Sequence, residues 1–322
     1  MTVRDVDVVI TGYGAVTGAG DDARFRAEWL AGRSAVRAFD GDAEGLPPGF
    51  GAQIAFTQKE LRALPGGRGL RPGTMTEFTY LACGAVGRAL LSAGITSPED
   101  EAEAVMERRG IYLGSYTNFP ELKKHVKLTH IMAEPVAAAS GDYVIDDGRV
   151  EEGMKGFTGF DFLKLMNNMP TAHGAIQAGA RGPANTLLGH APVGLMAVGR
   201  AADALRLDLA DQMVAGGTGP GASEGLAILR HGKQLLAAST AEPARAARPL
   251  DQASTGLVPG DVGAAVVVET ADHAARRGAR PMARVVAWRE SFAAPATPRG
   301  GLGDGAAVVH AALRPADAGL RW

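Results

Sequence analysis

The chain has 322 residues, of which 46% are hydrophobic and 21% are charged, and its formal net charge is −2. This composition is typical of a globular chain with one large or two ordinary domains, and the near-neutral charge gives no reason to expect nucleic acid or an anionic membrane as a partner. No apolar run is long enough to span a membrane and no signal peptide begins the chain, so we expect a cytoplasmic protein. The single cysteine, Cys83, lies in a helical pattern and is predicted to be a core residue in a reducing compartment.

The first forty residues predict a strand, a turn and a helix. Apolar residues 6–11 are typical of a buried strand, the glycine-rich residues 12–18 predict a turn, and a helical pattern follows through Trp29 and Leu30. The glycines do not keep the G-x-G-x-x-G spacing, and no ribose-binding acid follows on a second strand. The glycines therefore serve the turn and close packing, and no nucleotide site is predicted.

The next segments predict a loop, a long helix and a strand. Residues 41–71 are rich in Gly and Pro, which is typical of a loop. Residues 74–94 have apolar side chains at helical spacing and end at Gly94, and residues 110–114 predict a buried strand. The apolar face of the helix consists of Phe78, Leu81, Ala82, Ala85, Ala89 and Leu90.

Residues 121–159 combine a basic stretch with a later acidic one. His125 and His130 are five residues apart, so they do not stack on one helical face, and no third metal ligand is fixed beside them. The neighbouring lysines, Lys123, Lys124 and Lys127, predict a solvated face, with the docking of an acidic carrier protein as the alternative. The segment therefore predicts no metal site.

Residues 182–217 predict a strand, a tight turn, a helix and a second strand. The first strand covers residues 186–188, the turn ends at Pro192, which suits a first helical position, and the second strand covers residues 212–215 before two glycines. Enzymes place nucleophiles at such turns, because the free N–H groups and the positive end of the helix stabilise an anion. The turn is therefore the first candidate for a functional site.

This segment resembles the Gly-Pro, Thr-Ala-Cys-x-Ser-Gly and Asp-x-(apolar)-x-Ala-Gly-Gly pattern of the β-ketoacyl synthases, the condensing enzymes of the thiolase superfamily. The positions that match are Gly182, Pro183, Gly194, Asp211, Ala215, Gly216 and Gly217. The family's nucleophilic cysteine falls on Ala191, whose side chain has no nucleophile. The resemblance thus predicts a preserved scaffold without the catalytic group.

A second block, residues 247–263, resembles the family's Arg-Pro-Phe-Asp and Asp-Gly-Phe-Val-x-Gly-Glu-Gly-Ala-Gly stretches, with Asp261 in place of the acid. The matching positions are Arg248, Pro249, Asp251, Gly256, Val258, Gly260 and Gly263. In ketosynthases the loop that contains Tyr116, Asn118 and Phe119 lies near the acyl pocket, although an ordinary polar loop explains these residues equally well. The resemblance implies a substrate pocket bordered by these three residues together with Gly194 and Asp261, the latter ordering the active-site loop.

The resemblance implies a thiolase-like layered α/β fold of mixed sheets and helices. Residues 1–246 would form the N-terminal ketosynthase half, and residues 247–322 would begin the C-terminal half. The family's His-Gly-Thr loop, its lysine and second histidine, and its Gly-Phe-Gly-Gly turn have no counterpart in these residues. We therefore expect an incomplete second half, truncated at the C-terminus, with an open sheet edge and exposed apolar faces that make the protein depend on dimerisation.

Three functions follow from the resemblance. The first is a non-catalytic subunit, comparable to chain-length factors, that pairs with an active ketosynthase in polyketide or fatty-acid biosynthesis, as a heterodimer or else as a homodimer, with acyl carrier protein as a further partner. The second is an acyltransferase or condensing enzyme of atypical mechanism, for which His190 is a substitute nucleophile although Ala191 occupies the outward position. The third is an inactive truncated remnant. The first explains why the scaffold is kept without its cysteine, and none requires a metal or an organic cofactor.

Overall fold

The computed structural model describes residues 6–38, 50–54, 56–115, 147–155, 157–164, 166–189, 192–220, 237, 242–249 and 251–290. The chain divides into two compact units, Met1–Arg284 and Val285–Trp322. The described residues of the second unit, 285–290, contain no helix or strand. All elements named below therefore belong to the first unit.

The strands and helices alternate along the first unit. The strands are β1 (Val8–Thr17), β2 (Gly20–Asp21), β3 (Arg37–Ala38), β4 (Phe50–Gly51), β5 (Arg109–Ser115), β6 (Ala184–Leu188), β7 (Gln212–Pro220), β8 (Asp261–Thr270) and β9 (Ala283–Arg284). The α-helices are α1 (Asp22–Leu30), α2 (Gln58–Ala63), α3 (Glu77–Ser92), α4 (Glu103–Glu107), α6 (Asp147–Met154), α7 (Gly159–Lys164), α8 (Met169–Ala178), α9 (Val193–Arg206) and α11 (Ala271–Arg276). Short 3-10 turns are η1 (Gly67–Gly69), η2 (Pro72–Thr74), η3 (Pro98–Asp100) and η4 (Pro243–Arg245).

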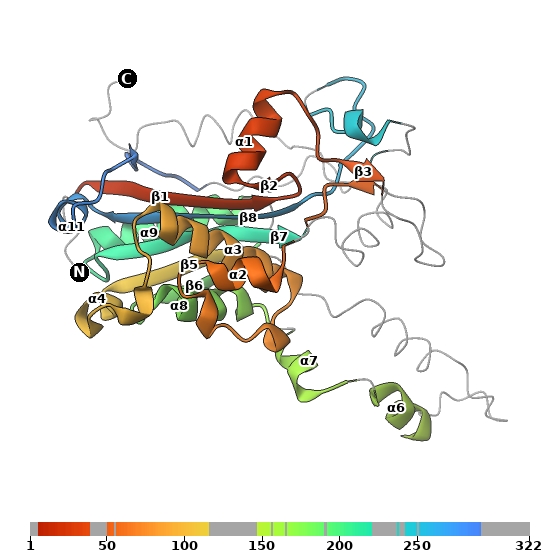
Figure 1. The fold of residues 1–322 in the computed structure, drawn as a ribbon, viewed down its shortest axis with the longest axis horizontal. Coiled ribbons are helices and arrows are strands. Elements are labelled where there is room, and N and C mark those ends of the chain that lie inside the picture. The colour runs from red at the N-terminus through yellow and green to blue at the C-terminus, as the bar shows by residue number, and fades with distance from the viewer. Residues whose placement is uncertain are drawn as a thin grey trace. The chain divides into compact units, whose positions relative to one another are not determined.

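A mixed sheet in the order β2-β1-β8-β7-β5-β6, with β9 beside β1, forms the centre of the unit (Figure 1). Strand β5 runs parallel to β6 and β7, whereas β8 runs antiparallel to β7 and β1. Although β8 comes late in the sequence, it thus lies in the middle of the sheet. The boundary expected between residues 246 and 247 stays a prediction.

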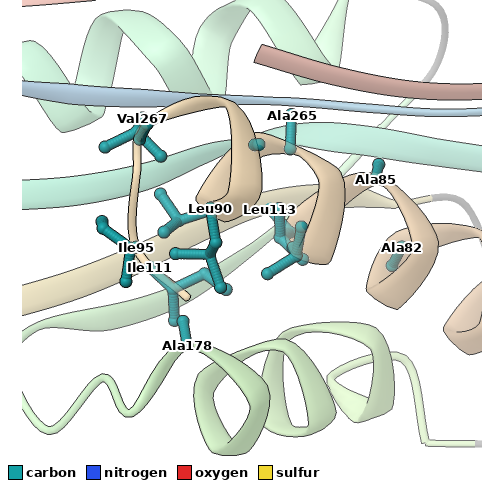
Figure 2. Packing of buried hydrophobic residues seen from close by; sticks show 13 residues of the cluster. Ala82, Ala85, Leu90, Ile95, Ile111, Leu113, Ala178, Ala265 and Val267 are labelled. Atoms are coloured by element: carbon teal, nitrogen blue, oxygen red, sulfur yellow. The ribbon is translucent and has the colours of Figure 1, made fainter. Parts of the chain in front are cut away.

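Helices pack on both faces of the sheet, as the α/β class predicts. Ile111 and Leu113 of β5 lie in a buried cluster with the apolar face of α3, and Figure 2 shows this cluster extending to β8 and to the end of α8. Gly114, the residue after Leu113, faces α9 instead, because successive side chains of a strand point to opposite faces. The sheet is therefore sandwiched between α3 and α8 on one side and α9 on the other.

Helix α3 is the long helix predicted over residues 74–94. Its predicted apolar face is buried, and it ends before Gly94, whose φ of +76° is a left-handed conformation that glycine adopts at no steric cost. Cys83 is fully buried in a second cluster with Leu61, Leu70 and Met75, so the prediction that it is a core residue is confirmed.

The turn predicted over residues 12–18 is wrong, because β1 continues through Thr17. A Cβ atom at Gly12 or Gly14 would collide with the backbone of α3 at Ala89, so these glycines allow the helix to approach the strand. Close packing, and not a turn, explains them. The chain turns only after Thr17, towards β2.

The loop predicted over residues 41–71 is also wrong in part, because β4, α2 and η1 lie within it. Helix α2 begins with a capping box: Thr57 Oγ1 accepts a hydrogen bond from Glu60 N at 3.2 Å, and Glu60 Oε2 accepts one from Thr57 N at 2.8 Å. These reciprocal bonds satisfy two backbone donors that a helix start leaves unpaired. The Thr-x-x-Glu spacing is visible in the sequence. It favours a helix here even though the surrounding glycines and prolines favour a loop.

Three boundaries differ from those predicted. Strand β7 continues past residue 215 to Pro220, because Gly216 and Gly217 allow a neighbouring strand and α9 to approach it. Pro192 is the N-cap of α9 and not its first helical residue. Strand β1 begins at Val8 and not at residue 6, and Arg284 of β9 pairs with Val9. No helix among the described residues is both long enough and apolar enough to cross a membrane.

Candidate functional site

The parallel strands bring the predicted functional turn to one edge of the sheet. The carboxyl ends of β5, β6 and β7 lie together, since Ser115 is in register with Leu188, and Gly114 with Gly217. Gly189 N donates a hydrogen bond to Ser115 O at 3.2 Å, which extends the pairing by one residue. The turn that follows β6 therefore starts directly beside the end of β5.

Three glycines allow the start of α9 to sit against these strand ends. A Cβ atom at Gly114 would lie 2.7 Å from the carbonyl carbon of Val193, and one at Gly217 would lie 2.9 Å from the Cα atom of Gly194. Both distances are shorter than van der Waals contact, so no larger residue fits without moving the helix. Gly194, predicted to border the substrate pocket, lies at this contact.

The amino end of α9 is free of side-chain caps. Its N-cap, Pro192, makes no side-chain hydrogen bond, and no acidic residue lies in the first turn. The first N–H groups of a helix have no intrahelical acceptor, and the helix dipole places partial positive charge there. The positive end of α9 thus begins at Pro192, which directly follows residue 191 in the sequence.

Five of the predicted site residues lie outside the described residues: Tyr116, Asn118, Phe119, His190 and Ala191. Their roles stay predictions. The structure does place the residues from which both segments begin, because Ser115 and Gly189 are hydrogen-bonded neighbours. The loop after β5 and the turn after β6 therefore start at the same point of the fold.

Asp261 is buried, with 3% of its surface exposed, at the start of β8 and opposite Pro220 of β7. Its Oδ2 atom accepts a hydrogen bond from Ile54 N at 3.1 Å, and its N–H donates to Ala52 O at 2.9 Å. Asp261 thus fastens residues 52–54 to the carboxyl edge of the sheet. Sequence reasoning missed this partner segment because it treated residues 41–71 as one loop.

Other reactive groups among the described residues lie in the core. Burial raises the pKa of the Cys83 thiol, so the only cysteine of the chain has no accessible thiolate. His173 is buried between Thr74 Oγ1, at 2.9 Å from Nε2, and Met169 O, at 3.0 Å from Nδ1, and burial lowers its pKa. These contacts give His173 a structural role in the core. In the described part of the chain, no three His, Cys, Asp or Glu side chains lie together as metal ligands would.

Comparison with known proteins gives a consistent result. A family model described as "Beta-ketoacyl synthase, N-terminal domain" matches residues 5–274. Among curated proteins, the 3-oxoacyl-[acyl-carrier-protein] synthase 2 of Vibrio cholerae is 28% identical over 97% of this chain and 70% of its own length. This similarity covers nearly all of the chain, including both blocks of the resemblance.

Two solved structures share the fold. The ishigamide ketosynthase/chain length factor aligns with a TM-score of 0.65 and 21% identity, over 89% of this chain and 63% of its own. A beta-ketoacyl synthase from Burkholderia phymatum aligns with a TM-score of 0.69 and 21% identity, over 91% of this chain and 66% of its own. The chain therefore spans about two thirds of the length of these structures. The predicted thiolase-like α/β fold is confirmed.

Proposed function

Because the chain belongs to the β-ketoacyl synthase family, we propose that it is a ketosynthase-like subunit of fatty-acid or polyketide assembly that pairs with an active ketosynthase. In this role it resembles a chain-length factor and does not condense acyl chains itself. The observation that carries the proposal is Ala191, which falls at the position of the nucleophilic cysteine when Gly182-Pro183, Gly194 and Ala215-Gly216-Gly217 are matched to the family pattern.

The chemistry of condensation explains why this substitution is decisive. The reaction needs a thiolate to hold the acyl chain, a group that assists loss of CO₂, and donors that stabilise the oxyanion. The amino end of α9 supplies donors, but Ala191 supplies no thiolate and Cys83 is buried. Loss of a covalent nucleophile lowers the rate by several orders of magnitude.

An exposed apolar edge supports pairing with a second chain. Strand β6 lies at the end of the sheet and, among the described residues, pairs only with β5. Three apolar side chains on and beside it are exposed: Leu188 on β6 by 57%, Ile176 on α8 by 60% and Leu195 on α9 by 78%. Open sheet edges with exposed apolar side chains are typical of strands that another chain covers. We propose this edge, including Leu188 at the carboxyl end of β6, as the contact with the ketosynthase.

The first experiment is co-expression with the ketosynthase encoded nearest in the genome, followed by affinity pull-down and a condensation assay with malonyl-loaded acyl carrier protein. We expect a stable heterodimer whose activity disappears when the partner's cysteine is replaced. Product formed by this chain alone would contradict the proposal and favour an atypical mechanism that uses His190. Absence of both complex and product would favour an inactive remnant.

A matched pair of substitutions tests the proposed edge. Leu188→Arg places a charge on β6, whereas Leu91→Arg places one at a similarly exposed leucine of α3, 53% exposed, away from this edge. We expect Leu188→Arg to abolish the pull-down and Leu91→Arg to leave it intact. Equal retention of the partner by both variants would place the contact elsewhere.

A further inference from the structure

Helix α7 reverses the usual arrangement of apolar and charged side chains. Phe160 is 61% exposed, and Leu163 is exposed as well. The ion-paired side chains of Asp161 and Lys164, by contrast, are only 12% and 21% exposed. A surface helix normally turns its apolar stripe towards the core and its charges towards water. The apolar side of α7 therefore does not serve to pack this helix on the rest of the described chain.

The apolar side continues past the end of the helix to Met166, which is also exposed. Phe160, Leu163 and Met166 are spaced by three residues, and residues at this spacing are neighbours on a helical surface. The helical turn is kept after Lys164, because Met166 N donates a hydrogen bond to Leu163 O at 3.1 Å. Phe160, Leu163 and Met166 thus form one apolar surface, named the α7 stripe below.

Local contacts hold α7 in its helical form. The N–H and the Oγ1 atom of Thr158 each donate a hydrogen bond to Asp161 Oδ2 at 2.8 Å, which is the reciprocal half of a capping box. The helix also packs beside η2. A partner that covers the α7 stripe therefore meets an ordered helix, and its binding costs little conformational entropy on this side.

The α7 stripe adjoins the carboxyl end of β6. Near the start of α8, Thr171 Oγ1 accepts a hydrogen bond from Thr186 Oγ1 of β6 at 2.7 Å. At the end of α8, Ala178 O accepts one at 2.9 Å from Arg109 Nη1, at the start of β5. Helix α8 therefore runs from the carboxyl end of the parallel strands towards their amino end. Because Met166 comes just before α8, the stripe lies at the carboxyl end, where the exposed edge of β6 also ends.

The edge of β6 alone is too small for a stable complex. A stable interface buries about 800 Å² on each partner and involves roughly 20–30 residues of each. Strand β6 has only five residues, which cover about 17 Å. A contact centred on this edge therefore has to include neighbouring surface, and the α7 stripe is exposed apolar surface that adjoins it.

We propose that the α7 stripe packs into an apolar groove of the partner ketosynthase, beside the part of that partner that meets β6. This inference rests on the pairing proposed above and assigns a second element of the chain to the same contact. Phe160 is the anchor, because buried aromatic side chains carry much of the binding energy of an interface. Leu163 and Met166 flank it, as anchors one turn apart do when a helix binds in a groove.

The test is the dissociation constant of the full chain for the ketosynthase encoded nearest in the genome, measured by surface plasmon resonance. Phe160→Ala removes the anchor, and Phe25→Ala removes a phenylalanine of α1 that is 44% exposed and belongs to neither surface. We expect Phe160→Ala to bind about 30-fold more weakly or worse and Phe25→Ala to bind as the wild type does, as loss of an aromatic anchor predicts. Equal affinities of the two variants would overturn the proposal.

The Leu188→Arg variant separates this proposal from the pairing on which it rests. If Leu188→Arg abolishes binding and Phe160→Ala retains it, the α7 stripe is not part of the contact, although the pairing stands. If the wild type binds no ketosynthase, both proposals fail. Slower hydrogen exchange over residues 159–164 in the complex than in the free chain would support the stripe as a contact.

Two measurements on the isolated chain identify other occupants of the stripe. If Phe160→Ala lowers the midpoint of thermal unfolding and Phe25→Ala does not, the chain itself covers the stripe and the proposal is wrong. If light scattering shows that the wild type alone is a dimer and that Phe160→Ala is a monomer, the occupant is a second copy of this chain and not a ketosynthase. We expect neither result, because the stripe is exposed in the isolated chain.

Discussion

The two ends of the parallel strands β5 and β7 are built in opposite ways. At the carboxyl end, α9 rests on Gly114 and Gly217, and the contacts are between backbone atoms. At the amino end, ionised side chains hold the structure: Arg108 binds two aspartates, and the fully buried Glu269 binds Arg277, His273 and Thr11. One end is therefore fixed by shape and the other by charge.

Because of this difference, we expect the two ends to respond to different substitutions. The contact between α9 and the strand ends depends on glycines and on the strand register. The stability of the unit depends instead on the charged end, and the predictions below separate the two.

The largest expected effect is at Glu269. Glu269→Gln removes the charge that balances Arg277, whose side chain is only 23% exposed, and we expect the free energy of unfolding to fall by about 3–5 kcal/mol. Urea denaturation measures this loss. The control is Glu28→Gln, which removes the partner of Arg33 at the surface and should have a far smaller effect. Equal losses in the two variants would contradict the view that the buried charges stabilise this end.

The same residue predicts a dependence on pH. Burial alone would raise the pKa of Glu269, but hydrogen bonds from Arg277, His273 and Thr11 outweigh it and lower the pKa from 4.5 to about 2. Because the folded pKa is the lower one, the stabilisation is complete above pH 4.5 and is lost as the pH falls towards 2. We expect the wild type to lose about 3 kcal/mol more than Glu269→Gln over this range. If the free energies of unfolding of the two proteins changed in parallel with pH, the lowered pKa of Glu269 would be refuted.

Local patterns predicted the elements of this fold better than their ends. The face of α3 and the strands over residues 110–114 and 186–188 follow from apolar periodicity, and the structure contains them. The glycine-rich stretch in β1 was misread as a turn, because a glycine that allows a helix to approach a strand looks the same in sequence as a glycine in a turn. Only the tertiary contact with α3 distinguishes the two.

Candidate site residues that belong to a motif could be predicted from the sequence. Residues that take part only through a tertiary contact could not. Gly194 and Asp261 follow from the resemblance, and both lie at the carboxyl edge of the sheet. The segment that binds Asp261, around Ile54, has no pattern of its own, because it contributes backbone N–H and C=O groups that every residue has. A cavity at the amino end likewise joins α4 to α11 across about 170 residues, which no local pattern links.

The glycine contacts at the carboxyl end can be tested in one strand. Gly217→Ala places a methyl group 2.9 Å from the Cα atom of Gly194, whereas Gly219→Ala, two residues further along β7, meets no atom within 4 Å. We expect Gly217→Ala to destabilise the fold by about 1–3 kcal/mol, as overpacking does, and Gly219→Ala to have little effect. Chemical denaturation of both variants provides the comparison. Tolerance of Gly217→Ala would mean that α9 can move away from the strands, and this end would then not be fixed by shape.

The smallest effect in this series is expected at Asp261, a buried acid at the carboxyl edge. Asp261→Ala leaves Ile54 N without its acceptor, and we expect a loss of about 1–2 kcal/mol. Asp251→Ala is the matched control, because Asp251 also accepts a backbone hydrogen bond, from Ala253 N at 2.8 Å, but at an exposed site where water replaces it. Hydrogen exchange measured over residues 52–54 would detect a local release that global denaturation misses. If exchange there stays slow in Asp261→Ala, backbone pairing alone holds the segment. The carboxyl end would then depend on shape and not on any charge.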